Sequence, residues 1–153
     1  MTIGLYFGTQ TGKTETVCGY IKEEFGDSVA DAIDVSKKDL ADFPNFDGLI
    51  CGIPTWNTGA EELRSGTAWD ELLEDIPDLD LKGKPVALFG LGDSVGYGED
   101  FVDAMEELHR YFEKAGAKMV GYVSLDGYEN FTSSRCLIPH LNEITKPEEG
   151  MKF

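Results

Sequence analysis

Short apolar runs alternate along this chain with segments of helical periodicity, and this alternation restricts the fold more than any other feature. The strand-like runs span residues 2–7, 29–35, 46–54, 84–92 and 117–125. Several of them are apolar on both faces, which is typical of strands that helices cover on both sides. The pattern predicts an α/β fold, in which an open parallel sheet carries helices on both faces.

The segments between these runs place apolar residues at helical spacing. Three helices are expected, with inward-facing residues Val17, Ile21 and Phe25 in 13–25, Trp69, Leu72 and Leu73 in 67–75, and Phe101, Met105, Leu108 and Phe112 in 101–115. Residues 36–43 allow only a short helix or a turn. The chain has 153 residues and contains no repeat or low-complexity linker. This length predicts a single domain spanning residues 1–153.

Three loops follow strand ends in this arrangement, at residues 8–14, 54–66 and 91–100. Each of them is rich in glycine, threonine, aspartate or an aromatic residue. Open α/β sheets bind ligands at the carboxyl ends of their strands, near the point where the strand order reverses. We therefore expect the three loops to converge on one site.

The first loop belongs to the segment FGTQTGKT (7–14), which has the appearance of a phosphate-binding loop. A nucleotide-triphosphate loop needs four residues between its glycines, but only three separate Gly8 from Gly12. The strand over 46–54 also ends in Pro54-Thr55, without an acid to hold magnesium. A nucleotide hydrolase is therefore disfavoured, and Lys13 is expected to be a solvated residue at a helix start.

Hydroxyl groups are what this loop does offer, from Thr9, Thr11 and Thr14. Together with Gln10 and the backbone amides of 10–14, they lie at the start of the first expected helix. The start of a helix binds an anion through its unpaired amides and its dipole, and neutral donors suit a terminal phosphate monoester. The alternative is that Thr9 and Thr11 only cap the helix.

The other two loops each present an aromatic side chain at the ligand end of the sheet. PTWNTG (54–59) contains Trp56, and GLGDSVGYGED (90–100) contains Tyr97 among glycines. Aromatic residues on such loops offer a flat face to a ligand. Two aromatics with a phosphate site between them predict a clamp for a flat ring that carries a phosphate tail.

These segments resemble the flavodoxins, small electron carriers that bind FMN. The resemblance rests on GTQTGKTE (8–15), PTWNTG (54–59) and GLGDSVGYGEDF (90–101), and it extends to about Gly127. LRSGTAWDE (63–71) is similar to the long-chain members of algae and cyanobacteria in particular. The resemblance implies a flavodoxin-like doubly wound sheet of five parallel strands in the order 2-1-3-4-5.

The resemblance also implies a set of cofactor-binding residues. The FMN phosphate would be surrounded by Thr9, Gln10, Thr11, Gly12, Lys13 and Thr14, with Lys13 contributing mainly its backbone. Thr55 and Asn57 would lie near the ribityl chain and ring edge, and Trp56 and Tyr97 would flank the ring. The flavin nitrogens and oxygens would meet backbone groups of Thr58, Gly59, Leu91, Gly92 and Asp100, and Pro54 and Asp93 complete the set.

The implied function is low-potential one-electron transfer, in which non-covalently bound FMN passes between oxidised, semiquinone and hydroquinone states. A carbonyl of the Asn57–Thr58 peptide would accept a hydrogen bond from N5–H only after reduction, and Gly59 permits the necessary rotation. Asp93, Glu99 and Asp100 would oppose the negative charge of full reduction. We identify no convincing catalytic acid, base or nucleophile. His109 falls in a helix and His140 in a loop, where structural or solvated roles are expected.

The chain has 29 acidic and 13 basic residues and a formal net charge of −16. Such a charge disfavours binding to nucleic acid and to anionic membranes, and it favours either basic protein partners or solubility alone. Eight acids lie between 61 and 80, namely Glu61, Glu62, Asp70, Glu71, Glu74, Asp75, Asp78 and Asp80, against one base, Arg64. This stretch is either a docking face around the flavin edge or a solvated helix face.

The resemblance implies redox partners with basic surfaces, such as ferredoxin-NADP reductase, photosystem I or other ferredoxin-dependent oxidoreductases, and a monomeric carrier. The three cysteines, Cys18, Cys51 and Cys136, form no CxxC pair, which suits a reducing compartment. No apolar run approaches the ~20 residues needed to span a membrane. A cytoplasmic location is expected, or the plastid stroma for a processed precursor.

The resemblance weakens after about residue 127. DGYENFTSS (126–134) begins like the loop that long-chain flavodoxins insert into their fifth strand, but the long amphipathic helix that closes the family's fold has no counterpart. The segment from Pro139 allows a short helix, and GMKF (150–153) has the pattern of a returning strand. One face of the sheet is therefore expected to be less covered than in the family.

Two other classes of function fit parts of this pattern. An FMN-dependent quinone or NAD(P)H reductase would use the same scaffold, but the chain lacks a basic pocket for a nicotinamide nucleotide. A flavin-free receiver domain would need an acidic cluster at the ends of the first and third strands. Those strands end instead in Phe7-Gly8 and Pro54-Thr55.

Overall fold

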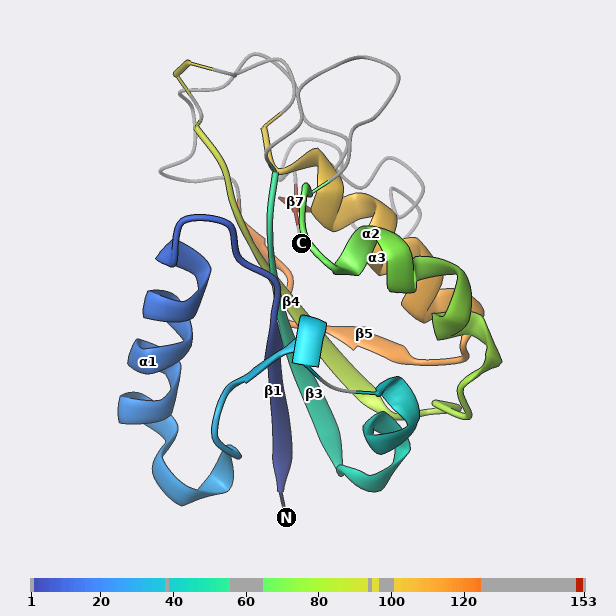
Figure 1. The fold of residues 1–153 in the computed structure, drawn as a ribbon. Coiled ribbons are helices and arrows are strands. Elements are labelled where there is room, and N and C mark those ends of the chain that lie inside the picture. Colours follow the sequence, from blue (N-terminus) through green and yellow to red (C-terminus); the bar gives the residue numbers. More distant parts are fainter. Residues whose placement is uncertain are drawn as a thin grey trace.

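The computed structural model describes residues 2–37, 39–55, 65–93, 95–96, 101–124 and 151–152. A parallel sheet of five strands, in the order β2-β1-β3-β4-β5, forms its centre (Figure 1). The strands are β1 (Ile3–Phe7), β2 (Ile33–Asp34), β3 (Gly48–Pro54), β4 (Pro85–Leu91) and β5 (Lys118–Val120). The α/β class and the strand order expected from the sequence are confirmed.

Helices lie on both faces of this sheet, as predicted. Helix α1 (Lys13–Phe25) covers one face, and α2 (Trp69–Leu72) and α3 (Asp103–Lys114) lie on the other (Figure 1). Short 3₁₀ helices occur at η1 (Gly26–Ser28), η2 (Val35–Lys37), η3 (Leu40–Asn45) and η4 (Leu73–Asp78). The boundaries of α1 match the predicted 13–25, and η2 and η3 provide the short helical turns expected near 36–43.

The larger core lies between the sheet and the layer formed by α2, η3, η4 and α3. Alternate residues of β3, Leu49, Cys51 and Ile53, point into it, because successive side chains of a strand face opposite sides. Aromatic rings pack across this layer, with Phe43 stacked on Phe112 at a centroid distance of 6.2 Å. Trp69 of α2 also meets Phe112 edge to face at 6.4 Å, so the rings join η3, α2 and α3 within this layer.

The smaller core lies under α1 and contains Leu5, Phe7, Cys18 and Val29. Helix α1 turns Thr14 and Cys18 inward, whereas Phe25 is 56% exposed. The prediction that Phe25 faces the core is therefore wrong, since the last turn of α1 extends beyond the apolar part of the sheet. Ile50 and Phe89 remain only half-buried on this face, where α1 is the one helix among the described residues.

Two predicted strands are shorter in the structure. Within 29–35, only Ile33–Asp34 forms a strand, and Val29 makes an isolated bridge with Ile3. Within 117–125, β5 stops at Val120 because Gly121 adopts a left-handed backbone with φ of 85°. The chain then forms β6 (Val123–Ser124), which pairs antiparallel with β7 (Met151–Lys152), where GMKF predicts a strand.

Among the residues that the structure describes, no helix has the length and apolar character required to cross a membrane.

Two buried thiols make the stability of the fold sensitive to alkaline pH. Cys18 and Cys51 are both buried free cysteines. Burial raises the pKa of Cys18 to about 12 and the pKa of Cys51 well above its ordinary value. Burial also raises the pKa of Tyr6 in the larger core to about 12.

We therefore expect the free energy of unfolding to decrease as the pH rises above about 9, the ordinary thiol pKa. In this range the unfolded chain loses thiol protons that the folded chain retains, so the contribution is complete below about pH 9 and is lost toward about pH 12. Each thiol contributes at most about 1.4 kcal/mol per pH unit. Urea unfolding at several pH values between about 7.5 and 10.5 measures how steeply the free energy of unfolding falls with pH. Cys18→Ala should have a shallower slope, and an unchanged slope would contradict the assignment.

Candidate functional site

A cavity of about 580 Å³ opens at the carboxyl ends of β1, β3 and β4. It is lined by Thr9, Gln10, Thr11, Lys13, Thr14, Val17, Pro54, Thr55, Leu91, Gly92 and Asp93. The volume falls in the usual range for small-molecule sites. The structure thus brings the described parts of the three predicted loops together. Val17, near the start of α1, is the one described lining residue that is absent from the predicted cofactor-binding residues. The sequence pattern had placed it in the core.

The turn into α1 leaves the start of the helix without a side-chain cap. Gly12 is the N-cap residue and has a left-handed backbone with φ of 85°, a conformation that glycine adopts without strain. Thr9 Oγ1 accepts a hydrogen bond of 2.9 Å from the Gly12 amide, which precedes the helix. Thr9 therefore folds the loop and does not cap the first helical turn, contrary to the capping alternative.

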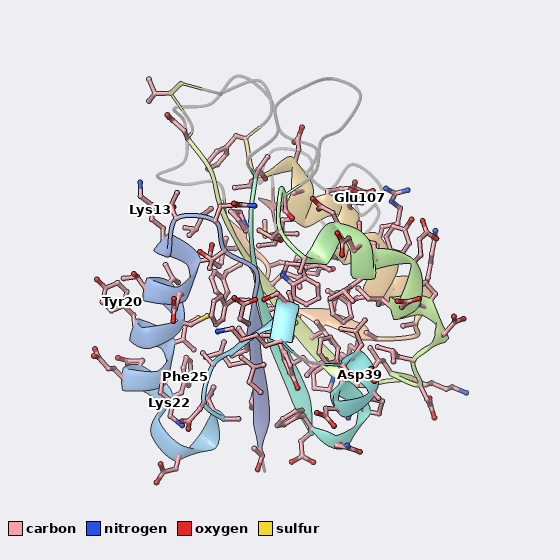
Figure 2. The ribbon with its side chains drawn as sticks, viewed as in Figure 1. Lys13, Tyr20, Lys22, Phe25, Asp39 and Glu107 are labelled. Carbon is pink, nitrogen blue, oxygen red and sulfur yellow. The ribbon has the colours of Figure 1, made fainter. Side chains whose placement is uncertain are left out.

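The first turn of α1 presents backbone amides and a buried hydroxyl to the cavity. Thr14 is 1% exposed and lines the cavity together with Thr11. Figure 2 shows the Lys13 side chain projecting away from the sheet, so its backbone is the part directed to this loop. Uncapped amides at the start of a 13-residue helix attract an anion through their hydrogens and the helix dipole.

Gly8 anchors the loop to the end of β3. The Gly8 amide donates to the carbonyl oxygen of Gly52 at 3.0 Å, and the indole Nε1 of Trp69 donates to the same oxygen at 2.9 Å. A Cβ atom on Gly8 would lie 2.7 Å from Trp69 Cδ1 and would overlap the Thr67 hydroxyl. Only glycine therefore allows the loop to lie this close to the 65–70 turn.

The 65–70 turn is itself closed by a network of hydrogen bonds to Asp70. Its carboxylate accepts from the Ser65 amide at 3.0 Å, the Ser65 hydroxyl at 2.8 Å and the Gly66 amide at 2.8 Å. The Ser65 and Thr67 hydroxyls are 2.6 Å apart. The sequence predicted neither this network nor the Trp69 contact to Gly52. Asp70 is thereby a structural residue of the turn, and its part in docking stays a prediction.

A second cavity, of about 450 Å³, lies on the other side of the same loop. It is lined by Thr9, Gln10, Asp34, Ser36, Gly66, Thr67, Ala68, Asp70 and Glu71. Asp34 Oδ1 accepts from the Ser36 amide at 2.9 Å, so this carboxylate, like that of Asp70, closes a local turn. Thr9 and Gln10 form a wall that the two cavities share.

The ends of β3 and β4 form the opposite wall of the first cavity. The Thr55 amide donates to the Leu91 carbonyl at 2.8 Å, and Thr55 Oγ1 accepts from the Ala104 amide at 3.1 Å. Asp93 Oδ1 accepts from the amides of Val95 at 3.0 Å and Gly96 at 2.7 Å. Asp93 therefore lines the cavity and also closes the turn that follows it.

The remaining predicted contacts fall outside the described residues. They are Trp56, Asn57, Thr58, Gly59, Tyr97 and Asp100, together with Glu99 and the inserted segment from about residue 126. The aromatic clamp over a flat ring therefore stays a prediction.

His109 is a buried part of the fold, as the sequence suggests. It is 1% exposed, and its Nε2 lies 2.8 Å from the Tyr122 hydroxyl. Its Nδ1 lies 3.8 Å from Glu113 on the next turn of α3. His140 falls outside the described residues. Within the described part of the chain, no three His, Cys, Asp or Glu side chains are arranged to hold a metal ion.

The acids of residues 61–80 are spread along the molecule and do not all surround the cavity. Glu71 is exposed and lines the second cavity, near the carboxyl ends of the strands. Helix η4 ends at Asp78, shortly before β4 begins at Pro85. Asp78 and Asp80 therefore lie toward the amino end of the sheet, away from the cavity. Glu61, Glu62 and Arg64 are outside the described residues.

The chemistry of the first cavity suits a ligand that ends in a phosphate monoester. Its described polar lining offers the hydroxyls of four threonines, the Gln10 carboxamide, Lys13 and one aspartate at the far wall, and it contains no histidine, cysteine or glutamate. Val17, Pro54 and Leu91 are its apolar members. Neutral donors and helix-start amides can hold an anion without a charged partner. The rest of the volume is available to the body of the ligand.

Comparisons with known proteins agree on one family. The flavodoxin family model matches residues 5–137. A flavodoxin of Nostoc sp. is 46% identical over 135 residues, covering 88% of this chain and 76% of the relative. A flavodoxin of Synechocystis sp. is 45% identical over 128 residues, covering 83% and 73%. The solved structure of Fusobacterium nucleatum flavodoxin bound to flavin mononucleotide aligns with a TM-score of 0.80 at 29% identity, covering 90% of this chain and 79% of that one.

We expect Gly8→Ala to lower the free energy of unfolding by about 1–3 kcal/mol, because the added methyl group pushes Thr67 and Trp69 away from the loop. Inorganic phosphate should also raise the melting temperature less in this variant than in the wild type. Gly19→Ala is the matched control, since nothing lies within 4 Å of a Cβ on this helical residue. It should stabilise the protein by about 0.5–1 kcal/mol. Equal stability of the Gly8→Ala variant and the wild type would contradict the close packing.

Proposed function

Because the chain belongs to the flavodoxin family, whose cofactor is FMN, we propose that it carries single electrons at low potential between redox partner proteins. When bound, FMN supplies the one-electron chemistry, and the protein supplies binding, orientation and electrostatics. The observation that carries the proposal is the uncapped start of α1, which borders a cavity of about 580 Å³, large enough for a small molecule that ends in a phosphate ester.

In this proposal, the first loop holds the phosphate. The donors are the amides at the start of α1 and the hydroxyls of Thr9, Thr11 and Thr14, with Gln10, Gly12 and Lys13 completing the loop. Gly12 supports this role because its left-handed backbone turns the chain into α1 with no side chain in the way. Thr14 supports it because a buried hydroxyl that lines the cavity is suited to a polar ligand atom.

The other two loops hold the rest of the cofactor. Pro54, Thr55, Leu91, Gly92 and Asp93 line the opposite wall of the cavity. We assign Asn57 to the ring edge and Trp56 and Tyr97 to the two faces of the ring. Backbone groups of Thr58, Gly59 and Asp100 complete the contacts to its polar edge. The Asn57–Thr58 peptide would offer its carbonyl to a proton that arrives on reduction, next to Gly59, which permits the turn.

Charge would set the order of the two reduction steps. Asp93 lies at the cavity wall, and Glu99 and Asp100 follow it on the same loop. Asp93 is exposed, and negative side chains close to the ring would oppose the arrival of a further negative charge through Coulomb repulsion. The second electron should therefore be accepted only at low potential.

The protein would act on its partners by docking, without substrate turnover of its own. A net charge of −16 steers it toward redox proteins with basic surfaces, for which ferredoxin-NADP reductase and photosystem I are candidates. We propose that it works as a monomer of a single domain, in the cytoplasm or the plastid stroma. Nucleic acid would be repelled by the same charge.

The test is anaerobic stepwise reduction of the FMN-loaded protein, followed by visible absorption. We expect a one-electron-reduced flavin to accumulate before full reduction, which free FMN in the same buffer should not match. Direct passage to the two-electron-reduced form, with steady NADPH oxidation in the absence of a partner, would support an FMN-dependent reductase instead. Failure to bind FMN would overturn the proposal.

Asp93→Asn is a matched variant for the electrostatic part of this test. It removes the charge and keeps the Oδ1 atom that accepts from Val95 and Gly96. The potential of the second step should become less negative, while the fold of the turn is retained. An unchanged second potential would show that the Asp93 charge does not oppose full reduction.

Docking is tested by reversing single charges at different distances from the cavity. Glu71→Lys should slow electron transfer to cytochrome c, a basic acceptor, by about threefold at low salt, because it removes attraction near the flavin edge. Asp78→Lys changes the net charge equally but lies toward the amino end of the sheet, so its effect should be smaller. The rates should converge at high salt. Equal effects of both variants would indicate steering by net charge alone.

A further inference from the structure

The start of α3 has an unusual N-cap residue. Val102 occupies this position with φ of 52° and ψ of 24°, and it is 2% exposed. Branched side chains seldom adopt a left-handed backbone, which is strained for them. Valine also offers no oxygen to the first-turn amides, whereas N-cap positions favour serine, threonine, asparagine and aspartate. The Val102 carbonyl accepts from the Met105 amide at 3.0 Å, but a side-chain cap for the first turn of α3 has to come from another residue.

Thr55 supplies this acceptor from the end of β3. Ala104 is the second residue of α3, and its amide donates to Thr55 Oγ1 at 3.1 Å. This is the amide that an N-cap side chain usually satisfies. Thr55 therefore caps α3 from a position 49 residues earlier in the sequence.

The same residue also ties the end of β3 to the end of β4. The Thr55 amide donates to the Leu91 carbonyl at 2.8 Å. A Cβ on the next residue, Gly92, would lie 3.2 Å from the Val102 amide nitrogen, so the end of β4 packs directly on the start of α3. Thr55, Leu91 and Gly92 all line the first cavity. Three elements thus meet at Thr55, in the wall of that cavity.

We propose that Thr55 is a positioning residue that couples the first turn of α3 to cofactor binding. A hydroxyl can accept one hydrogen bond and donate another at the same time, and bonds in series strengthen one another. A cofactor oxygen that accepts from Thr55 therefore strengthens the bond from Ala104 to Thr55. Because coupling between two sites is reciprocal, an ordered start of α3 also strengthens cofactor binding. The inference rests on the proposed FMN function.

Amide hydrogen exchange of the wild-type protein tests this coupling directly. Saturating FMN, at about 100 times its dissociation constant, should slow exchange of the Ala104 amide by up to about 100-fold, because opening of this turn would require release of the cofactor. Inorganic phosphate, which would occupy only the first loop, should leave this amide nearly unchanged. The Tyr111 amide, two turns further along α3, is the internal control and should change less than that of Ala104.

Variants of Thr55 separate the hydroxyl from the shape of the side chain. Thr55→Val should weaken FMN binding by about tenfold and accelerate exchange at Ala104, because the amide loses its acceptor. Thr55→Ser keeps the hydroxyl and should stay within about threefold of the wild type. Phe112→Leu destabilises α3 from its buried face and leaves Thr55 intact. It should lower stability without a comparable loss of FMN affinity.

The outcomes divide clearly between the two proposals. If the wild type does not bind FMN, the proposed function fails. If FMN binds but Ala104 exchange is the same with and without it, the coupling is overturned and the function stands. The coupling is also overturned if Thr55→Val binds FMN as tightly as the wild type, or if Phe112→Leu reproduces its loss of affinity.

Discussion

The carbonyl oxygen of Gly52 fixes the position of the whole site, because two groups from distant parts of the chain donate to it. The Gly8 amide reaches it from the end of β1, and the Trp69 indole reaches it from α2. Phe89 packs so closely on Gly52 that a Cβ there would overlap its ring. A side chain on Gly8 would therefore displace Thr67 and Trp69, and one on Gly52 would displace Phe89. These contacts fix the position at which the loop after Gly8 leaves the sheet.

Under the proposed function, the loop placed in this way would let a strongly acidic protein bind a phosphate. Backbone amides and hydroxyls need no positive side chain, so the anion site does not conflict with a net charge of −16. The acids near the site are used locally as well: Asp34, Asp70 and Asp93 each accept amide hydrogens that close a turn.

Local sequence patterns predicted what depends on local spacing. The apolar runs predicted the parallel sheet, the helical periodicity predicted the bounds of α1, and the three loops after strand ends contain all of the described cavity lining except Val17. The two errors have separate causes. Phe25 follows the helical period but extends beyond the sheet, and the run over 117–125 is interrupted at Gly121 by a left-handed backbone that the pattern does not reveal.

The sequence by itself determined the alternation of strands and helices and the three loops that meet at the strand ends, and it predicts that the first loop binds a phosphate. These features follow from residue type and periodicity within short segments. Only the tertiary structure decided that Trp69 and Thr67 support the first loop, that Asp70 closes a turn, and that Thr55 caps α3. Each of these depends on contacts between residues that are far apart in the sequence and meet only when the helices pack on the sheet. Such contacts produce no periodic pattern in the sequence.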